Sequence, residues 1–162
     1  MIKLADIKLV ISDVDGVMTD GRLYYDHRGE CMKVFNAHDG HGIKMLQSND
    51  VHFAIVSGSK DDHISARARD LGITHVICNS KNKAKDAIWL MNEFEVMRNE
   101  TACIGDDLLD IPMFDVCGLS FAPANATKRV LVDAGTVLTK NGGEGVVREL
   151  AELILEAKSS VR

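Results

Sequence analysis

The chain has 162 residues, of which 46% are hydrophobic and 27% are charged, and its formal net charge is −5. This length and composition predict a single globular domain, residues 1–162, with a sizeable core. The acidic balance is not the footprint of a nucleic-acid-binding protein, and it gains little from an anionic membrane surface. No apolar run approaches the roughly 20 residues of a membrane-spanning helix, and the first residues show no signal-peptide pattern. We therefore expect no nucleic-acid partner and no membrane contact.

The four cysteines are widely spaced and form no CxxC pair. Three of them lie in or beside apolar strand-like runs, which favours buried free thiols over a disulfide or a zinc site. Such thiols are typical of a reducing compartment, so the pattern predicts a cytoplasmic protein. The residues are Cys31, Cys78, Cys103 and Cys117.

Apolar runs of strand length alternate with helical patterns along the chain. This alternation predicts βαβ units and a Rossmann-like, doubly wound α/β fold with a parallel sheet covered on both faces. The last helical segment has the clearest apolar stripe, with spacings of three and four from Val146 to Ala157. The predicted strands are 7–12, 53–57, 75–78, 102–105, 119–121 and 136–138, and the predicted helices are about 40–49, 60–71, 82–94, 107–116, 125–134 and 143–158.

The first predicted strand ends in the sequence Asp13-Val14-Asp15-Gly16. It brings two carboxylates to the carboxyl end of a buried strand, where open α/β sheets keep their sites. Two like charges so close repel each other, and a Mg²⁺ ion would relieve that repulsion because it prefers oxygen ligands and brings phosphate with it. The alternative is an Asx-turn that simply ends the strand.

A segment at about residues 20–36 departs from the alternation. Its apolar pieces, 23–25 and 32–35, flank a polar turn at 26–29 that contains a glycine, which predicts a β-hairpin. The hairpin lies between the first strand and the first helix, so it should project near the active face. Its apolar side chains could pack within the chain, or they could meet a partner subunit, because so small a hairpin cannot bury both of its faces.

Two further strand ends carry groups that suit a phosphate. Ser57 could donate to a phosphate oxygen, and Gly58 would let the backbone approach closely, although Ser-Gly is also a common turn pair. The next strand is followed by Lys81, Lys83 and Lys85, one of which could offset the charge of carboxylates and of a transferring phosphoryl group. Most surface lysines are simply solvated, so the choice among the three stays open at this point.

The segment Gly105-Asp106-Asp107 repeats the pattern of strand, glycine and carboxylates. One carboxylate could meet the metal while the other orients a neighbouring group. Asp107 and Asp110 could instead favour the N-terminus of the following helix through its dipole. Taken together, four strand ends present two aspartates, a serine, a lysine and a second acidic pair, which points to phosphoryl chemistry.

These motifs resemble those of the haloacid dehalogenase superfamily: DVDG at 13–16, VSG at 56–58, a lysine, and GDDLLD at 105–110. More narrowly, the segments 13–25, 33–46 and 142–149 are similar to the 3-deoxy-D-manno-octulosonate 8-phosphate phosphatase subfamily. The resemblance implies a Mg²⁺-dependent phosphomonoesterase that acts on a sugar-acid phosphate of lipopolysaccharide biosynthesis. Related phosphatases of nine-carbon, sialic-type acid 9-phosphates share much of the pattern. A phosphatase of such an acid, or of another small phosphomonoester, is the alternative, and a non-catalytic oligomerisation module is the remote one.

The resemblance also implies roles for the motif residues. Asp13 would be the nucleophile that forms an aspartyl-phosphate, and Asp15 would be the general acid and base. Asp13, Asp106 and the backbone carbonyl of Asp15 would hold Mg²⁺. Lys83 would be the catalytic lysine, because it best matches the third motif, and Ser57 with Gly58 would bind the phosphate.

The intervals from Asp13 to Ser57 and from Ser57 to Lys83 leave no room for a cap domain, so the active face would be open. The resemblance implies a homotetramer whose hairpins associate and whose neighbouring chains help to close each site. In that assembly Arg67 would reach a neighbour's substrate carboxylate, unless it lies on a solvated helix face.

The mouth of the site would be lined by the segment 36–42, in which Asp39 would contact substrate. His38 and His41 in this segment could bind a metal, but contact with substrate or with a neighbouring chain is favoured. Ser59 departs from the resemblance, because octulosonate phosphatases typically have Arg there and a nine-carbon relative has Glu.

Overall fold

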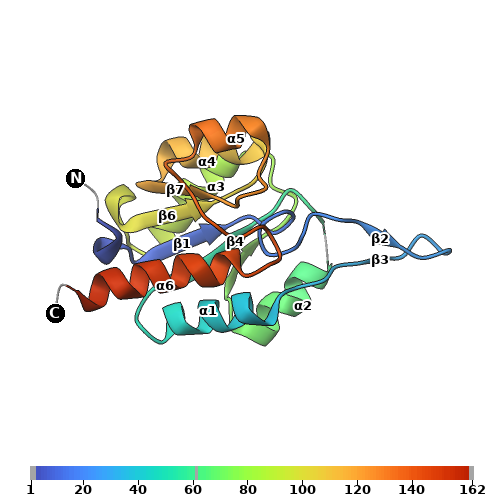
Figure 1. Cartoon of the computed structure of the whole chain (residues 1–162), viewed down its shortest axis with the longest axis horizontal. Coiled ribbons are helices and arrows are strands. Elements are labelled where there is room, and N and C mark those ends of the chain that lie inside the picture. The colour runs from blue at the N-terminus through green and yellow to red at the C-terminus, as the bar shows by residue number, and fades with distance from the viewer. Residues whose placement is uncertain (1–2, 61, 161–162) are drawn as a thin grey trace.

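A six-stranded parallel sheet forms the centre of the computed structural model, which describes residues 3–60 and 62–160. The strand order is β5-β4-β1-β6-β7-β8 (Figure 1). The first strand of the chain therefore lies in the middle, and the chain winds outward from it in both directions, as the predicted doubly wound fold requires. The strands are β1 (Leu9–Ser12), β4 (His52–Val56), β5 (His75–Ile77), β6 (Thr101–Ile104), β7 (Leu119–Ala122) and β8 (Thr136–Val137).

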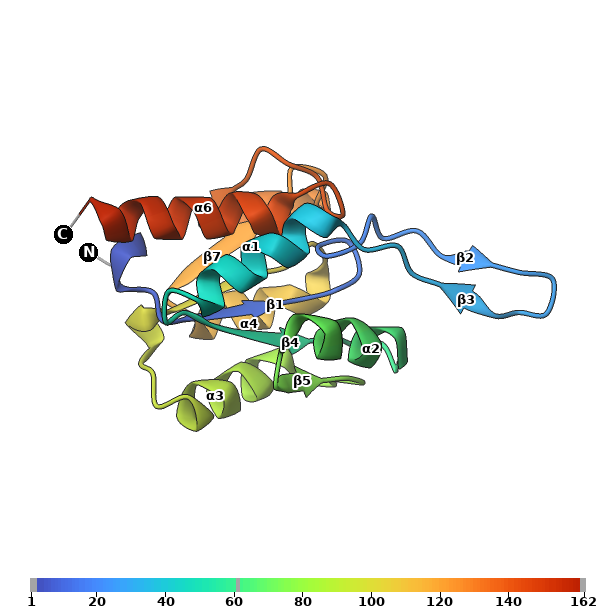
Figure 2. The same cartoon turned by 90° about the horizontal axis from the view of Figure 1, so that it is seen from below.

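Helices cover both faces of the sheet (Figures 1 and 2). One face is covered by α1 (Ala37–Gln47), α2 (Asp62–Leu71) and α6 (Val146–Ser159). The other face is covered by α3 (Lys83–Glu93), α4 (Ile111–Val116) and α5 (Lys128–Asp133). Short 3₁₀ turns occur at Leu4–Asp6, Arg98–Glu100 and Leu108–Asp110.

The alternation of side chains along β1 divides the core into two parts. Val10 packs with α1 and α6 on one face, while Leu9 and Ile11 pack with α3 and α4 on the other. All four residues of β1 are buried, which explains why a central parallel strand appears in the sequence as a continuous apolar run. The strand cannot shift without disturbing both cores, so the residues that follow it are held in a fixed place.

The predicted elements are confirmed, with differences at their ends. The first helix begins at Ala37 rather than near residue 40, because the side chain of Asn36 accepts a hydrogen bond from His38 N and caps it. The predicted helix 107–116 is a 3₁₀ turn followed by α4, which has Pro112 in its first turn. The predicted start of the helix at 60 differs slightly, since α2 begins at Asp62 and residue 61 lies outside the described residues.

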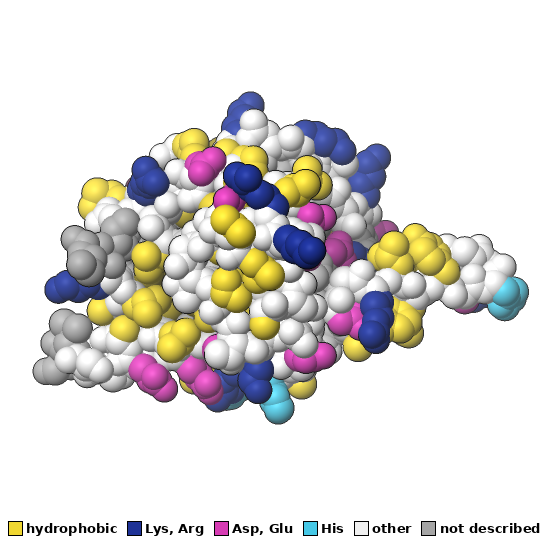
Figure 3. All heavy atoms as spheres, turned by 45° about the horizontal axis from the view of Figure 1, so that its top comes forward, with side chains coloured by type: hydrophobic (Ala, Val, Ile, Leu, Met, Phe, Trp, Pro, Cys, Tyr) yellow, Lys and Arg dark blue, Asp and Glu magenta, His cyan; other side chains and the backbone are white. Residues whose placement is uncertain are grey.

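The predicted hairpin is also confirmed, and we call residues 20–36 the arm. Its strands β2 (Tyr24–Tyr25) and β3 (Cys31–Met32) pair antiparallel and project well beyond the body (Figure 2). The turn is closed by Asp26, whose side chain accepts hydrogen bonds from the backbone N–H groups of Arg28 and Glu30. Hydrophobic side chains gather along the arm, where no other described element covers them (Figure 3). In the part of the chain that the structure describes, no larger segment is inserted, and the fold has no cap.

No helix among the described residues is both long and apolar enough to cross a membrane.

The packing of α6 on α1 should dominate the stability of the first core. Leu150 is completely buried there, so Leu150→Ala should lower the free energy of unfolding by about 2–5 kcal/mol in urea titrations. Val132→Ala is the control, because Val132 is 78% exposed and its truncation should change stability by less than about 0.5 kcal/mol. Equal effects of the two variants would contradict this description of the core.

Candidate active site

A cavity of about 320 Å³ lies at the carboxyl ends of the central strands. It collects residues from the segments that follow β1, β4 and β6 and from the start of α3, and Gly21 of the arm also lines it. The sequence predicted that these segments would meet, because the carboxyl ends of parallel strands share one edge of a sheet. Its lining includes Asp13, Asp15, Ser57, Gly58, Ser59, Lys83, Asp106, Asp107 and Asp110.

Lys83 lies at the floor of this cavity between two carboxylates. Its Nζ is 2.9 Å from Asp13 Oδ1 and 2.5 Å from Asp110 Oδ1, and all three side chains are almost wholly buried. Lys81 and Lys85 are exposed. Of the three candidate lysines, Lys83 is therefore the one that can act on a group bound beside Asp13.

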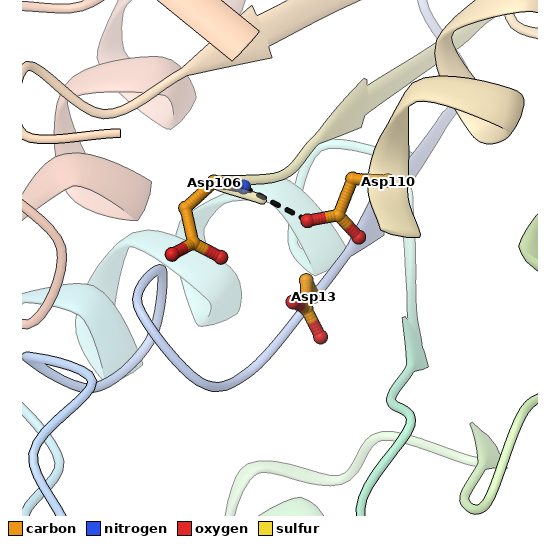
Figure 4. A group of neighbouring side chains, drawn as sticks. All are labelled: Asp13, Asp106 and Asp110. Carbon is orange, nitrogen blue, oxygen red and sulfur yellow. Dashed lines mark hydrogen bonds between the residues drawn. The ribbon is translucent and has the colours of Figure 1, made fainter. Parts of the chain in front are cut away.

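Asp110 is a site residue that the sequence did not single out for chemistry. Its Oδ2 accepts hydrogen bonds from the backbone N–H groups of Asp106 (Figure 4) and Asp107. Its Oδ1 accepts from Lys83. Gly105 makes this possible, since a Cβ there would lie 2.3 Å from the Cβ of Asp110. Asp110 therefore shapes the loop after β6 and holds the lysine. The only sequence signal was its place in the GDDLLD segment, where a helix N-terminus explained it equally well.

Asp106 approaches the first motif directly. Gly16 has φ +83°, and a Cβ on it would lie 2.0 Å from Asp106 Oδ2. Only glycine combines this backbone conformation with so close an approach. The glycine of the first motif thus makes room for the carboxylate of the fourth.

The electrostatics of the cavity are dominated by excess negative charge. Burial, reinforced by the charge of Asp110 and opposed by Lys83, raises the pKa of Asp13 to about 7. Burial, with the charges of Asp110 and Asp107, likewise raises the pKa of Asp106 to about 7. Burial alone would lower the pKa of Lys83, but the charges of Asp13 and Asp110 outweigh it, so this pKa is raised. Lys83 stays charged, yet one ammonium does not balance the carboxylates around it.

The carboxylates fit a divalent cation. Oxygens of Asp13, Asp106 and Asp110 all lie within 4.8 Å of one another. Both oxygens of Asp110 are already engaged by Lys83 and backbone N–H groups, so Asp13 and Asp106 are the better ligands. Oxygen-only ligands with surplus negative charge are what Mg²⁺ requires.

Asp15 and Ser57 lie at the rim and wall of the cavity. The side chain of Asp15 forms an ion pair with Lys33 of the arm, a partner that the sequence analysis missed. Ser57 is buried, and its hydroxyl accepts a hydrogen bond from the backbone N–H of Ser59. Both lie where a group bound at Asp13 would meet them.

Asp39 and Arg67 are not brought into this cavity. Asp39 is buried under α6, where its Oδ1 accepts a hydrogen bond from Arg148 N in the first turn of that helix. Arg67 donates to the backbone carbonyl of Asn36, and its guanidinium lies over the ring of Phe35. Within this chain the carboxylate of Asp39 is directed at the first turn of α6 and not into the cavity, so its contact with substrate stays a prediction.

The fold and the site define a class of protein. Residues 72–150 match the model of the haloacid dehalogenase-like hydrolase family. The chain is 45% identical over 161 residues to the 3-deoxy-D-manno-octulosonate 8-phosphate phosphatase KdsC of Haemophilus influenzae, covering 98% of this chain and 89% of that protein. It is 40% identical to the phosphatase of the same name from Yersinia pestis, covering 98% of this chain and 85% of that protein. The chain therefore belongs to the haloacid dehalogenase-like hydrolases, in the family of the 3-deoxy-D-manno-octulosonate 8-phosphate phosphatases.

Solved structures agree with this family. The cobalt-bound form of the deoxy-D-mannose-octulosonate 8-phosphate phosphatase from Haemophilus influenzae superposes with a TM-score of 0.93 at 43% identity, covering 96% of this chain and 91% of that chain. The Moraxella catarrhalis phosphatase, in complex with a magnesium ion, a phosphate ion and a KDO molecule, gives a TM-score of 0.93 at 32% identity, covering 97% and 90%.

Replacing Asp106 should stabilise the metal-free protein at alkaline pH. The pKa of Asp106 is about 7 in the folded protein against an ordinary value of 3.8, so the folded state binds its proton more tightly than the unfolded state does. Stability is therefore lost as pH rises from about 4 to 7. Asp106→Asn should raise Tm by about 2–4 °C at pH 8, and the difference should shrink as pH falls and vanish near pH 4, the ordinary pKa of the carboxyl.

Asp107→Asn is the matched control, because Asp107 is the exposed neighbour and its amide can still cap the 3₁₀ turn. Added Mg²⁺ should raise the Tm of the wild type and of Asp107→Asn, but not that of Asp106→Asn. A Tm of Asp106→Asn below the wild type at pH 8 in chelator would contradict the charge balance described here.

Proposed function

We propose that this protein is a Mg²⁺-dependent phosphatase that hydrolyses 3-deoxy-D-manno-octulosonate 8-phosphate. The observation that carries the proposal is Asp13, a buried carboxylate at the end of the central strand, held by Lys83 and facing Asp106. A group placed so can attack phosphorus and be neutralised at once by its neighbours. The substrate is inferred from the family. The relatives that match nearly the whole length of this chain are named as phosphatases of this sugar-acid phosphate.

The first step transfers the phosphoryl group to Asp13. A carboxylate oxygen of Asp13 attacks phosphorus, the bond from phosphorus to the sugar oxygen breaks, and Asp15 gives a proton to that oxygen. The products are an aspartyl-phosphate on Asp13 and the free sugar-acid alcohol. Lys83 favours the ionised form of Asp13, against the burial that raises its pKa.

The second step releases phosphate. Asp15, now a carboxylate, takes a proton from water, the water oxygen attacks phosphorus, and the bond to Asp13 breaks. Ser57 and Gly58 hold phosphate oxygens, and Lys83 offsets their charge. Mg²⁺ held by Asp13, Asp106 and the backbone carbonyl of Asp15 would supply the remaining positive charge that the phosphoryl group needs.

The space beside the phosphate site suits a substrate larger than phosphate. A second cavity, of about 360 Å³, shares Ser59 with the first. It is lined by Leu23 and Tyr25 of the arm, by the basic side chains of Lys33 and Lys60, and by the single acidic side chain of Asp62. Apolar and basic walls together suit the carbon chain and the carboxylate of a sugar acid. A nine-carbon acid 9-phosphate is the alternative substrate, because the same features would accept it.

The test is phosphate release with Mg²⁺ from octulosonate 8-phosphate, nine-carbon acid 9-phosphates and common sugar phosphates. We expect preference for the octulosonate, loss of activity in chelator and its return with Mg²⁺. Asp13→Asn should lower kcat/KM by more than about 10³-fold, because the nucleophile is gone. Asp133→Asn, at the end of α5 and outside both cavities, is the control for loss of a carboxylate. Full activity of Asp13→Asn, or no release from any substrate, would refute the proposal, whereas preference for a nine-carbon acid would change the substrate alone.

We also propose that the protein is a homotetramer in which the arms associate and neighbouring chains close the open sites. The support is the exposure of the arm's apolar side chains, among them Tyr25 at 64% and Met32 at 57%. Apolar groups gathered on a projecting hairpin are typical of an interface. A contact of Arg67 with a neighbour's substrate stays a prediction. A cytoplasmic location is proposed as well, since none of the cysteines in the described residues forms a disulfide.

Met32→Asp should break this assembly. A carboxylate at an apolar interface loses its hydration without gaining a partner, so the variant should elute as a smaller species in size-exclusion chromatography with light scattering. Val132→Asp is the control, because Val132 is even more exposed, at 78%, but lies on α5 and not on the arm. A monomeric wild type, or an unchanged mass for Met32→Asp, would contradict the tetramer.

A further inference from the structure

The acid–base carboxyl of the proposed mechanism is held by the arm. Lys33 Nζ donates to Asp15 Oδ1, across 18 positions of sequence. The side chain of Lys33 is only 2% exposed, while that of Asp15 is 35% exposed. The lysine is therefore the more enclosed partner and lines the second cavity, while the carboxylate is the partner that lines the cavity of Asp13.

A lysine is enclosed in this way only when its charge is compensated. Burying an ammonium costs several kcal/mol in general, and a close carboxylate offsets that cost. An exposed ion pair would contribute little and would leave both side chains mobile. Here the enclosed ammonium has a fixed position, and it fixes the oxygen to which it donates.

The pairing also divides the work of the two oxygens of Asp15. With Oδ1 engaged by Lys33, Oδ2 is the oxygen left to exchange a proton with substrate. A general acid must hold its proton within hydrogen-bond reach of the leaving oxygen, so the direction of Oδ2 decides how well it works. Asp13, Lys83 and Asp106, by contrast, are positioned from the sheet and the loop after β6 without any contribution from the arm.

We propose that Lys33 is a positioning residue for Asp15, which directs Oδ2 of that carboxyl toward the leaving group and makes general acid catalysis depend on the arm. The inference rests on the proposed function, because it assigns a supporting role within the same reaction. It goes further in treating the arm as part of the chemistry, and not only as a contact surface. Lys33 itself need not touch the substrate.

Leaving groups of different basicity separate this role from a merely structural one. A sugar alkoxide is a poor leaving group that needs a proton as it departs, whereas a nitrophenolate leaves as a stable anion without one. A misdirected Asp15 should therefore slow attack on an alkyl phosphate much more than attack on an aryl phosphate. General damage to the cavity would slow both alike. The quantity to measure is kcat/KM, because it reports the steps up to the aspartyl-phosphate and excludes the hydrolysis that both substrates share.

The experiment compares octulosonate 8-phosphate with 4-nitrophenyl phosphate for the wild type, Lys33→Gln and Lys33→Arg. We expect Lys33→Gln to lower kcat/KM by about 10²-fold on the sugar phosphate and by only about tenfold on the aryl phosphate. Lys33→Arg keeps the charge with a different reach, so it should recover part of the loss on the sugar phosphate. Asp15→Asn should show the same bias between substrates, and adding Lys33→Gln to it should change that bias little.

Arg28→Gln is the matched control, because it removes a basic side chain from the turn of the same arm, where its ion pairs are with Asp26 and Glu30. It should leave the ratio of the two activities unchanged. Thermal unfolding by circular dichroism will show whether each variant is folded. If Lys33→Gln is unfolded, the comparison is made with Lys33→Arg instead. Equal losses on both substrates would overturn the role of Lys33 but leave the phosphatase standing. A wild type inactive on both would overturn the proposed function itself.

Discussion

The ammonium of Lys83, buried between Asp13 and Asp110, is the interaction on which the whole site depends. Three carboxylates converge on this floor, and a single lysine cannot balance them. Such an arrangement is unfavourable in the absence of a further cation, and the raised pKa values of Asp13 and Asp106 express that cost. The fold tolerates this unfavourable charge because the two hydrophobic cores pack on both faces of the central strand and keep the carboxylates in place.

A second set of contacts joins the first motif to the end of the chain. The backbone N–H of Gly143 donates to the carbonyl of Val17, and the side chain of Asn36 donates to the carbonyl of Gly143. Asp39 then accepts from the first turn of α6. The loop after Asp15 is therefore held against the loop before α6, and that loop is held in turn by Asn36, where the arm ends. The segment 142–149, which the sequence analysis named only for its resemblance to the subfamily, therefore braces the site through these contacts.

The part of the site that could be predicted from the sequence is the part delivered by strand ends. Asp13, Ser57 and Asp106 each follow an apolar run, and the geometry of a parallel sheet brings such positions together whatever the details of packing. The choice of Lys83 among three lysines rested instead on the resemblance to the family. Asp110 could not be assigned, because its hydrogen bonds to the backbone of Asp106 and Asp107 arise from a loop conformation that composition does not encode. The meeting of Lys33 with Asp15 depends on the direction in which the arm leaves the body, and periodicity carries no information about that. Asp39 lies in the first turn of α1, and nothing in the sequence indicated that its carboxylate would be directed at α6.

The placement of the arm separates two tasks that a single loop would have to combine. Every group that touches phosphorus in the proposed reaction comes from the sheet and its loops, while Leu23 and Tyr25 of the arm wall the neighbouring space where the rest of a substrate fits. A change in those arm residues can therefore alter which alcohol is accepted without displacing the nucleophile or its metal ligands. In evolutionary terms the sequence of the hairpin can change while the residues around Asp13 stay the same. With the role proposed for Lys33, that lysine is the arm residue that such changes must keep.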